Sequence, residues 1–217
     1  MFGLPLPQAI AVSLLPLLFA ITVHEVAHGW VAYKLGDKTA KMMGRLTLNP
    51  IKHIDPVGTI LVPGMLLLLG GFIFGWAKPV PVTIENLRQP RRDMALVALA
   101  GPAANLLMAL IWAVIAKVGM LLVPGMEWLG TPLVLMGIVG ITFNLVLMVL
   151  NLLPILPLDG GRVVESALPG PLSYKFSRLE PYGFLVLLGL LISGLLPSIL
   201  GPPIHFFEKT IFQIFGL

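Results

Sequence analysis

Two histidines and a glutamate interrupt the apolar segment LLFAITVHEVAHGWVAYKLG at residues 17–36. His24 and His28 are four residues apart, so on a helix they share one face and are separated by a rise of about 6 Å. At this spacing two imidazoles can bind one zinc ion, with Glu25 beside the first ligand as general base. Titratable side chains in hydrocarbon are costly and usually mark function. The spacing therefore predicts a zinc site on a membrane helix.

The structural alternative is that the two histidines make hydrogen bonds between helices. That explanation leaves Glu25 costly and without a role, whereas zinc binding accounts for all three residues. A catalytic zinc usually has three protein ligands and an open position for water. Among the acidic residues, only Glu25 and Asp159 fall within or at the end of the long apolar runs described below. Asp159 is therefore the expected third ligand.

Asp159 stands in the segment NLLPILPLDGG at residues 151–161. Two prolines break the helix before it and two glycines turn the chain after it, so the carboxylate can project inward from irregular backbone. Such backbone is tolerated at membrane depth where it lines protein or a wet cavity. The alternative is an ordinary Asp-Gly turn at a helix exit.

The composition indicates which elements must position these residues. Of 217 residues, 57% are hydrophobic and 11% are charged, and the mean hydropathy is +0.96. A soluble domain has about a quarter charged residues, so the composition predicts an all-α polytopic membrane protein in a lipid bilayer. The net charge of +4 does not imply nucleic acid as a partner, because basic loops account for it. The absence of cysteine excludes disulfides and cysteine-bound metals.

Apolar runs of spanning length predict about four transmembrane helices, at residues 8–33, 94–118, 131–153 and 182–200. A fifth run, 57–76, contains Pro-Gly and Gly-Gly pairs and is either a re-entrant hairpin or a full span. The first run is expected to be retained rather than cleaved as a signal peptide, because no Lys or Arg precedes Lys34. One membrane-embedded domain over 1–217 is the simplest organisation, with its core at about 8–165 and a C-terminal helix and tail at about 181–217.

The basic residues predict how these helices are oriented. The loops at 34–56, 77–93 and 160–180 contain twelve of the 14 lysines and arginines. The positive-inside rule places all three loops in the cytoplasm. The run 57–76 then enters and leaves on one side, which favours the re-entrant hairpin. The two histidines and the aspartate meet near the cytoplasmic surface, where water can enter.

Two stretches between the apolar runs alternate like strands, GRLTLNP at 44–50 and KPVPVTI at 78–84. We expect short membrane-associated strands there and hypothesise that one edge pairs with an extended peptide by β-augmentation. Plain connecting loop is the alternative. His53 is left out of the ligand set because a lone loop histidine is usually solvated; approach to the zinc when no substrate is bound is the alternative. The tail at 202–217 is expected to form either an interfacial helix or a packed terminal segment.

The sequence HEVAH in a first core helix, followed by NLLPILPLDGG in a later one, resembles the site-2 protease family of intramembrane zinc metalloproteases. The spacing from Asn151 to Asp159 matches that family's second motif, N-x-x-P-x-x-x-L-D-G. The segment AGPAANL at 100–106 resembles the start of the family's middle core helix. The similarity covers about residues 8–165. The chain resembles a minimal form without PDZ or CBS-like regulatory domains.

The resemblance implies a role for five residues: His24, His28 and Asp159 as ligands of one zinc ion per chain, Glu25 as general base, and Asn151 as a helper near the substrate carbonyl. It implies hydrolysis of a peptide bond in or near the transmembrane segment of a membrane-protein substrate, for regulated intramembrane proteolysis or clearance of signal-peptide remnants. A hydrogen bond to a neighbouring helix is the structural alternative for Asn151, and it is the preferred explanation for Asn105 and Asn144.

Two rival functions stay open. A membrane metal-ion transporter would use the same ligands as a transit site, but transport favours weak successive sites with a path to both faces. The sequence instead offers one triad near one face. A catalytically inactive scaffold of the same fold is the second rival, and the intact set of three ligands and a base argues against it.

Overall fold

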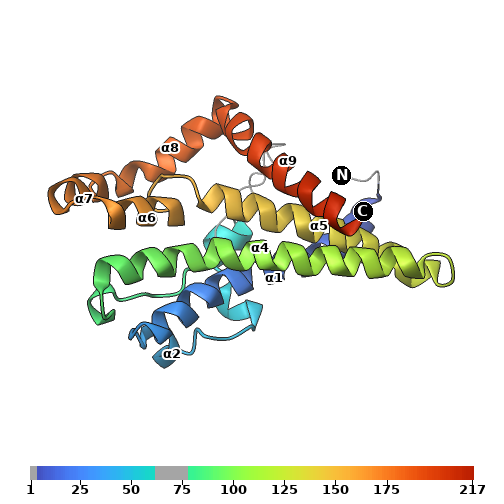
Figure 1. Ribbon diagram of the computed structural model, residues 1–217, viewed down its shortest axis with the longest axis horizontal. Coiled ribbons are helices and arrows are strands. Elements are labelled where there is room, and N and C mark those ends of the chain that lie inside the picture. Colours follow the sequence, from blue (N-terminus) through green and yellow to red (C-terminus); the bar gives the residue numbers. More distant parts are fainter. Residues whose placement is uncertain (1–3, 62–77) are drawn as a thin grey trace.

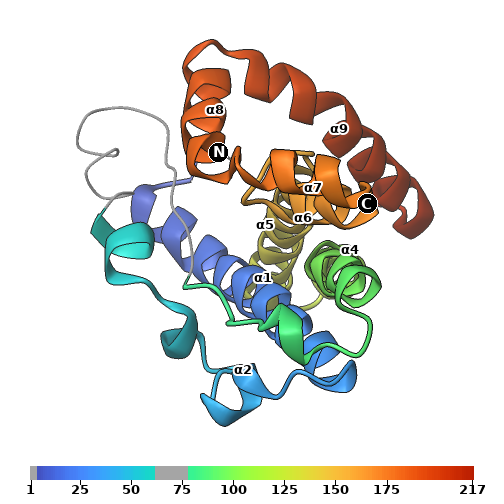
Figure 2. The ribbon, with the colours of Figure 1, turned by 90° about the vertical axis from the view of Figure 1, so that its left-hand side faces the viewer.

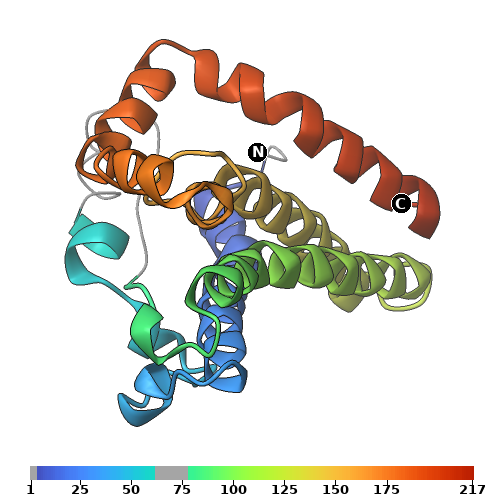
Figure 3. The same cartoon turned by 60° about the vertical axis from the view of Figure 1, so that its left-hand side comes forward.

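Three long helices dominate the computed structural model, which describes residues 4–61 and 78–217. These are α1 (Leu6–Lys34), α4 (Pro90–Leu122) and α5 (Glu127–Asn151). Helices α4 and α5 run side by side along the longest axis of the molecule (Figure 1). Helix α1 crosses both of them at a steep angle, as Figure 3 shows. This crossing brings the second half of α1 against the first half of α4.

Shorter helices cover one end of this group and one of its sides. The other elements of the described residues are α2 (Thr39–Met42), η1 (Pro50–His53), η2 (Pro56–Leu61), η3 (Ile84–Asn86), α6 (Asp159–Ala167), α7 (Gly170–Ser177), α8 (Glu180–Ile192) and α9 (Leu195–Phe215). Viewed along α4, the helices α6 and α7 lie next to its N-terminal end, and α8 and α9 arch over α5 (Figure 2).

The helices α1, α4 and α5 are each long and apolar enough to cross a membrane. Helices α8 and α9 make a fourth span if they are counted together, although they meet at 85°. The bend lies at Gly194, whose φ of 73° is in the left-handed region that favours glycine. The chain is therefore a multi-pass membrane protein, and the first three expected runs are confirmed as helices. Most of the expected re-entrant run, 57–76, lies outside the described residues.

Small residues allow α4 and α5 to pack closely. A Cβ on Gly137 would lie 2.5 Å from the Cβ of Ala116, and a Cβ on Gly140 would clash with the Trp112 ring. Close approach through glycine and alanine is a common way for membrane helices to associate, since hydrocarbon supplies no hydrophobic driving force between them. Ile211 of α9 is 3% exposed and packs into the same core. One face of the tail helix thus packs on the core, as the second of the two expected alternatives requires.

The strands expected at 44–50 and 78–84 are absent from the residues that the structure describes, so that prediction is wrong. The first stretch forms a turn and a bend before η1, and the second has no partner strand within residues 4–61 and 78–217. Pro79 and Pro81 lack two of the N–H donors that a ladder needs. The Arg45 side chain donates to the carbonyls of Lys78 and Pro79. Alternation over seven residues fits such a side-chain-held segment as well as it fits a strand.

Candidate metal centre

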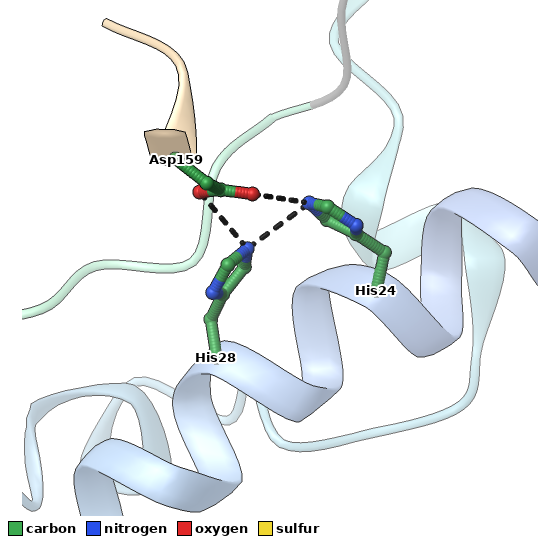
Figure 4. Close-up of side chains that lie close together, drawn as sticks. All are labelled: His24, His28 and Asp159. Carbon is green, nitrogen blue, oxygen red and sulfur yellow. Dashed lines mark hydrogen bonds and ion pairs between the residues drawn. The ribbon is translucent and has the colours of Figure 1, made fainter. Parts of the chain in front are cut away.

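His24, His28 and Asp159 converge on one point inside the molecule (Figure 4). Both histidines project from the same face of α1, and the aspartate is the first residue of α6. His24 Nε2 lies 3.3 Å from Asp159 Oδ2, and His28 Nε2 lies 3.4 Å from Asp159 Oδ1. The two Nε2 atoms are 3.0 Å apart. The structure therefore brings together all three predicted ligands across more than 130 residues of sequence.

The hydrogen bonds of the two rings determine which nitrogens face this point. His28 Nδ1 donates to the carbonyl oxygen of Val97 at 2.7 Å, because that oxygen can only accept. His24 Nδ1 donates to Asn105 Oδ1 at 2.5 Å. When both rings are neutral, these hydrogen bonds put the proton on Nδ1, so the Nε2 lone pairs point toward each other and toward the carboxylate. Two lone pairs and an anion at such distances repel unless a cation lies among them.

A divalent metal ion fits this donor set. Two imidazole nitrogens and one carboxylate oxygen are the ligands of many catalytic zinc sites, which keep a fourth position for water. Asp159 Oδ2 is buried and has no hydrogen-bond partner among the described residues. Its 3.3 Å contact with His24 Nε2 is within ion-pair distance, yet two acceptors cannot form a hydrogen bond. A metal ion at this point would explain why a buried carboxylate oxygen has no hydrogen-bond donor.

The first part of α4 forms the floor of the centre. A Cβ on Gly101 would lie 2.6 Å from Cε1 of both His24 and His28. No side chain larger than hydrogen fits there without moving the rings. Asn105, one turn later, makes the hydrogen bond to His24. The segment AGPAANL therefore supplies both space and a ring-orienting acceptor.

Asn105 belongs to a fully buried polar network between three helices. Its Nδ2 donates to the carbonyl of Ala20 at 3.2 Å and to Asn144 Oδ1 at 2.9 Å. Asn144 Nδ2 in turn donates to the carbonyl of Gly140 at 2.8 Å. The structure confirms the expected interhelical role of Asn105 and Asn144. It adds the contact with His24, which the sequence analysis missed, although the spacing of Gly101 and Asn105 on one helix face was a signal for it.

Glu25 lies beside the metal group but does not belong to it. Its Oε2 accepts a hydrogen bond from the main-chain N–H of Val80 at 2.7 Å. The side chain is partly buried. A carboxylate next to a metal site and oriented by a fixed donor is suited to accept a proton from water.

Asn151 and His53 complete the set of residues singled out from the sequence. Asn151 ends α5, and its Nδ2 donates to the carbonyl of Leu147 in the same helix at 2.9 Å. His53 is 2% exposed, which corrects the expectation that it is solvated. Helix η1 turns its ring inward, where Nε2 donates to the carbonyl of Thr47 at 2.9 Å. His53 is not part of the metal-ligand group, as expected.

Comparison with known proteins identifies the family. Residues 12–124 match the sequence profile of "Peptidase family M50". The chain is 42% identical over 203 residues to "Putative zinc metalloprotease YwhC" of Bacillus subtilis, covering 92% of this chain and 89% of that protein. It is 31% identical over 176 residues to "Putative zinc metalloprotease Rip2" of Mycolicibacterium smegmatis, covering 81% of this chain and 64% of the relative.

A second Rip2, from Mycobacterium tuberculosis, is 29% identical over 204 residues, which cover 92% of this chain and 71% of that protein. No solved structure matches. The profile covers more than half of the chain and includes both histidines, Glu25 and the α4 floor. The YwhC alignment extends over nearly the whole length of both proteins. The chain therefore belongs to peptidase family M50, the site-2 protease family.

Proposed function

We propose that this chain is an intramembrane zinc metalloprotease that cleaves a peptide bond in or near the transmembrane segment of a membrane-protein substrate. The convergence of His24, His28 and Asp159 on one point, with both Nε2 lone pairs directed inward, carries the proposal. The names of the relatives as zinc metalloproteases support the choice of metal. We propose one zinc ion per chain, and one protease domain whose core, at about 8–165, contains every residue of the site.

The protein's own groups supply the remaining chemistry. A zinc ion in this site provides Lewis acidity, which acidifies water and polarises a peptide carbonyl. Glu25 accepts the proton that attacking water loses and returns it to the leaving amine. The second N–H of Asn151 Nδ2, beyond the one given to Leu147, donates to the oxygen that becomes negative during attack.

The site is proposed to open toward the cytoplasm. The support is the distribution of basic residues, which are concentrated in the loops on the side of α6 and α7. Because the chain has no cysteine, one introduced thiol is an unambiguous probe. Lys175→Cys is expected to react with an impermeant maleimide only from the cytoplasmic side, and Gly125→Cys only from the opposite side. The reverse pattern would refute the orientation.

The function is tested with purified wild-type protein and a Glu25→Gln variant in detergent. Zinc content per chain and cleavage of a model transmembrane peptide are measured on both. The proposal expects about one zinc in each and cleavage by the wild type alone. Zinc in both proteins with cleavage by neither, over a panel of transmembrane peptides, would favour a transporter or an inactive scaffold. Absence of zinc from both would refute the metal site.

A further inference from the structure

An extended segment, 78–83, crosses the face of α1 that carries Glu25. Val80 lies at its centre, is 7% exposed, and donates its main-chain N–H to Glu25 Oε2 at 2.7 Å. The residues on either side, Pro79 and Pro81, have no N–H. Val80 therefore presents the single main-chain donor between Lys78 and Val82, and that donor is used on the expected catalytic base.

The first end of this segment is fixed by a buried arginine. Arg45 is 8% exposed, and its Nη2 donates to the carbonyls of Lys78 at 2.8 Å and Pro79 at 3.3 Å. The N–H of Lys78 donates to the carbonyl of His53 at 2.9 Å. The two residues before Val80 thus have their main-chain polar groups held by partners from the 45–53 region.

The second end is fixed by a buried aspartate. Asp37 is 0% exposed and accepts from the N–H of Thr83 at 2.8 Å, the side-chain amide of Asn86 at 3.1 Å and the N–H of Thr39 at 3.0 Å. Burial raises the pKa of Asp37, but its hydrogen bonds, of which that from the Thr39 hydroxyl is the largest, outweigh burial and leave the pKa below its ordinary value. The carboxylate is therefore ionised at neutral pH and holds these donors strongly.

Close packing keeps the centre of the segment against α1. Gly29 follows Glu25 by one helical turn, and a Cβ there would lie 2.8 Å from Val80 Cγ1 and 2.7 Å from Leu46 Cδ2. The absence of a side chain at Gly29 lets Val80 approach the helix backbone. The segment 78–83 is thus held at both ends and packed against Gly29. This arrangement places the N–H of Val80 at the carboxylate of Glu25.

We infer that Val80 is a positioning residue whose main-chain N–H holds the Glu25 carboxylate in the orientation that proton transfer requires. This inference rests on the proposed function. The bond engages Oε2, so the other oxygen stays available to accept a proton. A free glutamate at a helix surface samples several rotamers, and a fixed donor removes that freedom before the reaction begins. Because the donor is a backbone group, the side chain at position 80 acts only through its packing against Gly29.

Hydrogen exchange tests the contact without any substrate. Since prolines flank Val80, it contributes the one exchangeable main-chain hydrogen in residues 79–81. Exchange of this hydrogen is expected to be about tenfold or more faster in a Glu25→Ala variant, which removes the acceptor. A Glu25→Gln variant retains an oxygen acceptor and is expected to stay close to wild type. The N–H of Thr83, held by Asp37, serves as an internal control. Equal exchange at Val80 in all three proteins would overturn the inference.

Measurements of kcat and KM test whether this hydrogen bond supports catalysis. Val80→Pro deletes the N–H and is expected to lower kcat about 10- to 100-fold with little change in KM or zinc content. Val80→Ala keeps the N–H and loses only packing against Gly29, so it is expected to retain a higher kcat than Val80→Pro. In a Glu25→Asp background, where the shorter side chain cannot reach the donor, Val80→Pro is expected to cost nothing further.

Three results separate the possibilities. A Val80→Pro variant with wild-type kcat would overturn the inference while leaving the proposed protease function intact. Should Val80→Pro fail to fold or to hold zinc, the exchange rates in Glu25→Ala and Glu25→Gln decide the matter alone. Failure of the wild type to cleave any peptide would refute the proposed function, and the exchange experiment would still show whether Val80 holds Glu25.

Discussion

Asn105 Oδ1 lies 2.5 Å from His24 Nδ1, and this contact decides which nitrogen of a metal ligand carries the proton. It links α4 to α1 at the depth of the metal centre. Val97 does the same for His28 through its carbonyl oxygen. One helix thus orients both ligands that the neighbouring helix presents. Such outer partners of metal-bound histidines fix the tautomer and raise ligand basicity.

Replacement of Asn105 by alanine should weaken zinc binding. His24 would lose its Nδ1 acceptor, and both tautomers would become populated, so zinc affinity is expected to fall about 10- to 100-fold. Competition with a chromophoric chelator measures the effect. Asn144→Ala is the matched comparison, since Asn144 reaches His24 only through Asn105, and its effect should be smaller. Unchanged zinc affinity in the Asn105→Ala variant would contradict the inference that Asn105 orients His24.

A methyl group at position 101 should displace the ligands. The Cβ of Gly101→Ala would lie 2.6 Å from Cε1 of both histidines, well inside van der Waals contact, so zinc content is expected to drop sharply. Gly189→Ala is the control, because a Cβ there meets open space on α8. Alanine in place of a helical glycine usually stabilises by about 0.5–1 kcal/mol. Zinc analysis and thermal unfolding in detergent distinguish the two variants; full zinc in Gly101→Ala would contradict the packing argument.

Metal removal should destabilise the fold locally. Without a cation, the two Nε2 lone pairs and Asp159 face one another at 3.0–3.4 Å. A chelator is therefore expected to lower the thermal midpoint in detergent, and one equivalent of zinc to restore it, as for any ligand that binds the native state alone. Asp159→Asn should bind zinc at least about tenfold more weakly and respond less to the chelator. Glu85→Gln, a change outside the site, should behave like wild type.

The stabilising contribution of the Asp37 hydrogen bonds should respond to acid in a defined direction. The pKa of Asp37 is lowered in the folded protein by hydrogen bonds that outweigh burial. A group with a depressed folded pKa stabilises the protein above its unfolded pKa, and this contribution is lost as pH falls through the folded value. Thermal midpoints of wild type and Asp37→Asn are thus expected to differ most at neutral pH and to converge below the ordinary carboxyl range. A difference that stays constant down to pH 3 would contradict this.

The metal ligands could be predicted from the local sequence because each motif lies within a few residues. Residues four apart share a face on any helix, so the spacing of the histidines was informative once a helix was expected there. The structure has that helix at residues 6–34. Asp159 was found by its prolines and glycines, and the structure differs only in making it the first residue of α6 rather than part of the irregular backbone. Apolar run length predicted α1, α4 and α5 for the same reason.

The parts that sequence did not predict depend on contacts between distant segments. Alternation suggested a strand at 78–84, but Arg45 and Asp37 satisfy its main chain in place of a partner strand. His53 was expected to be solvated, yet a short helix turns it into the interior. The contacts from Asn105 to His24 and from Val80 to Glu25 span 81 and 55 residues. No local pattern encodes which residue lies opposite which at such separations.

The long sequence interval between the ligands has a consequence for biosynthesis. His24 and His28 enter the membrane first, and Asp159 is added roughly 130 residues later, which at 5–20 residues per second takes roughly 7–26 s. Until then the histidine pair is only a partial site, because its carboxylate has not been made. The centre cannot reach its full affinity, and the nascent chain stays inert, until α6 has been synthesised. Under the proposed function, the order of translation therefore delays proteolytic activity until α6 has been made.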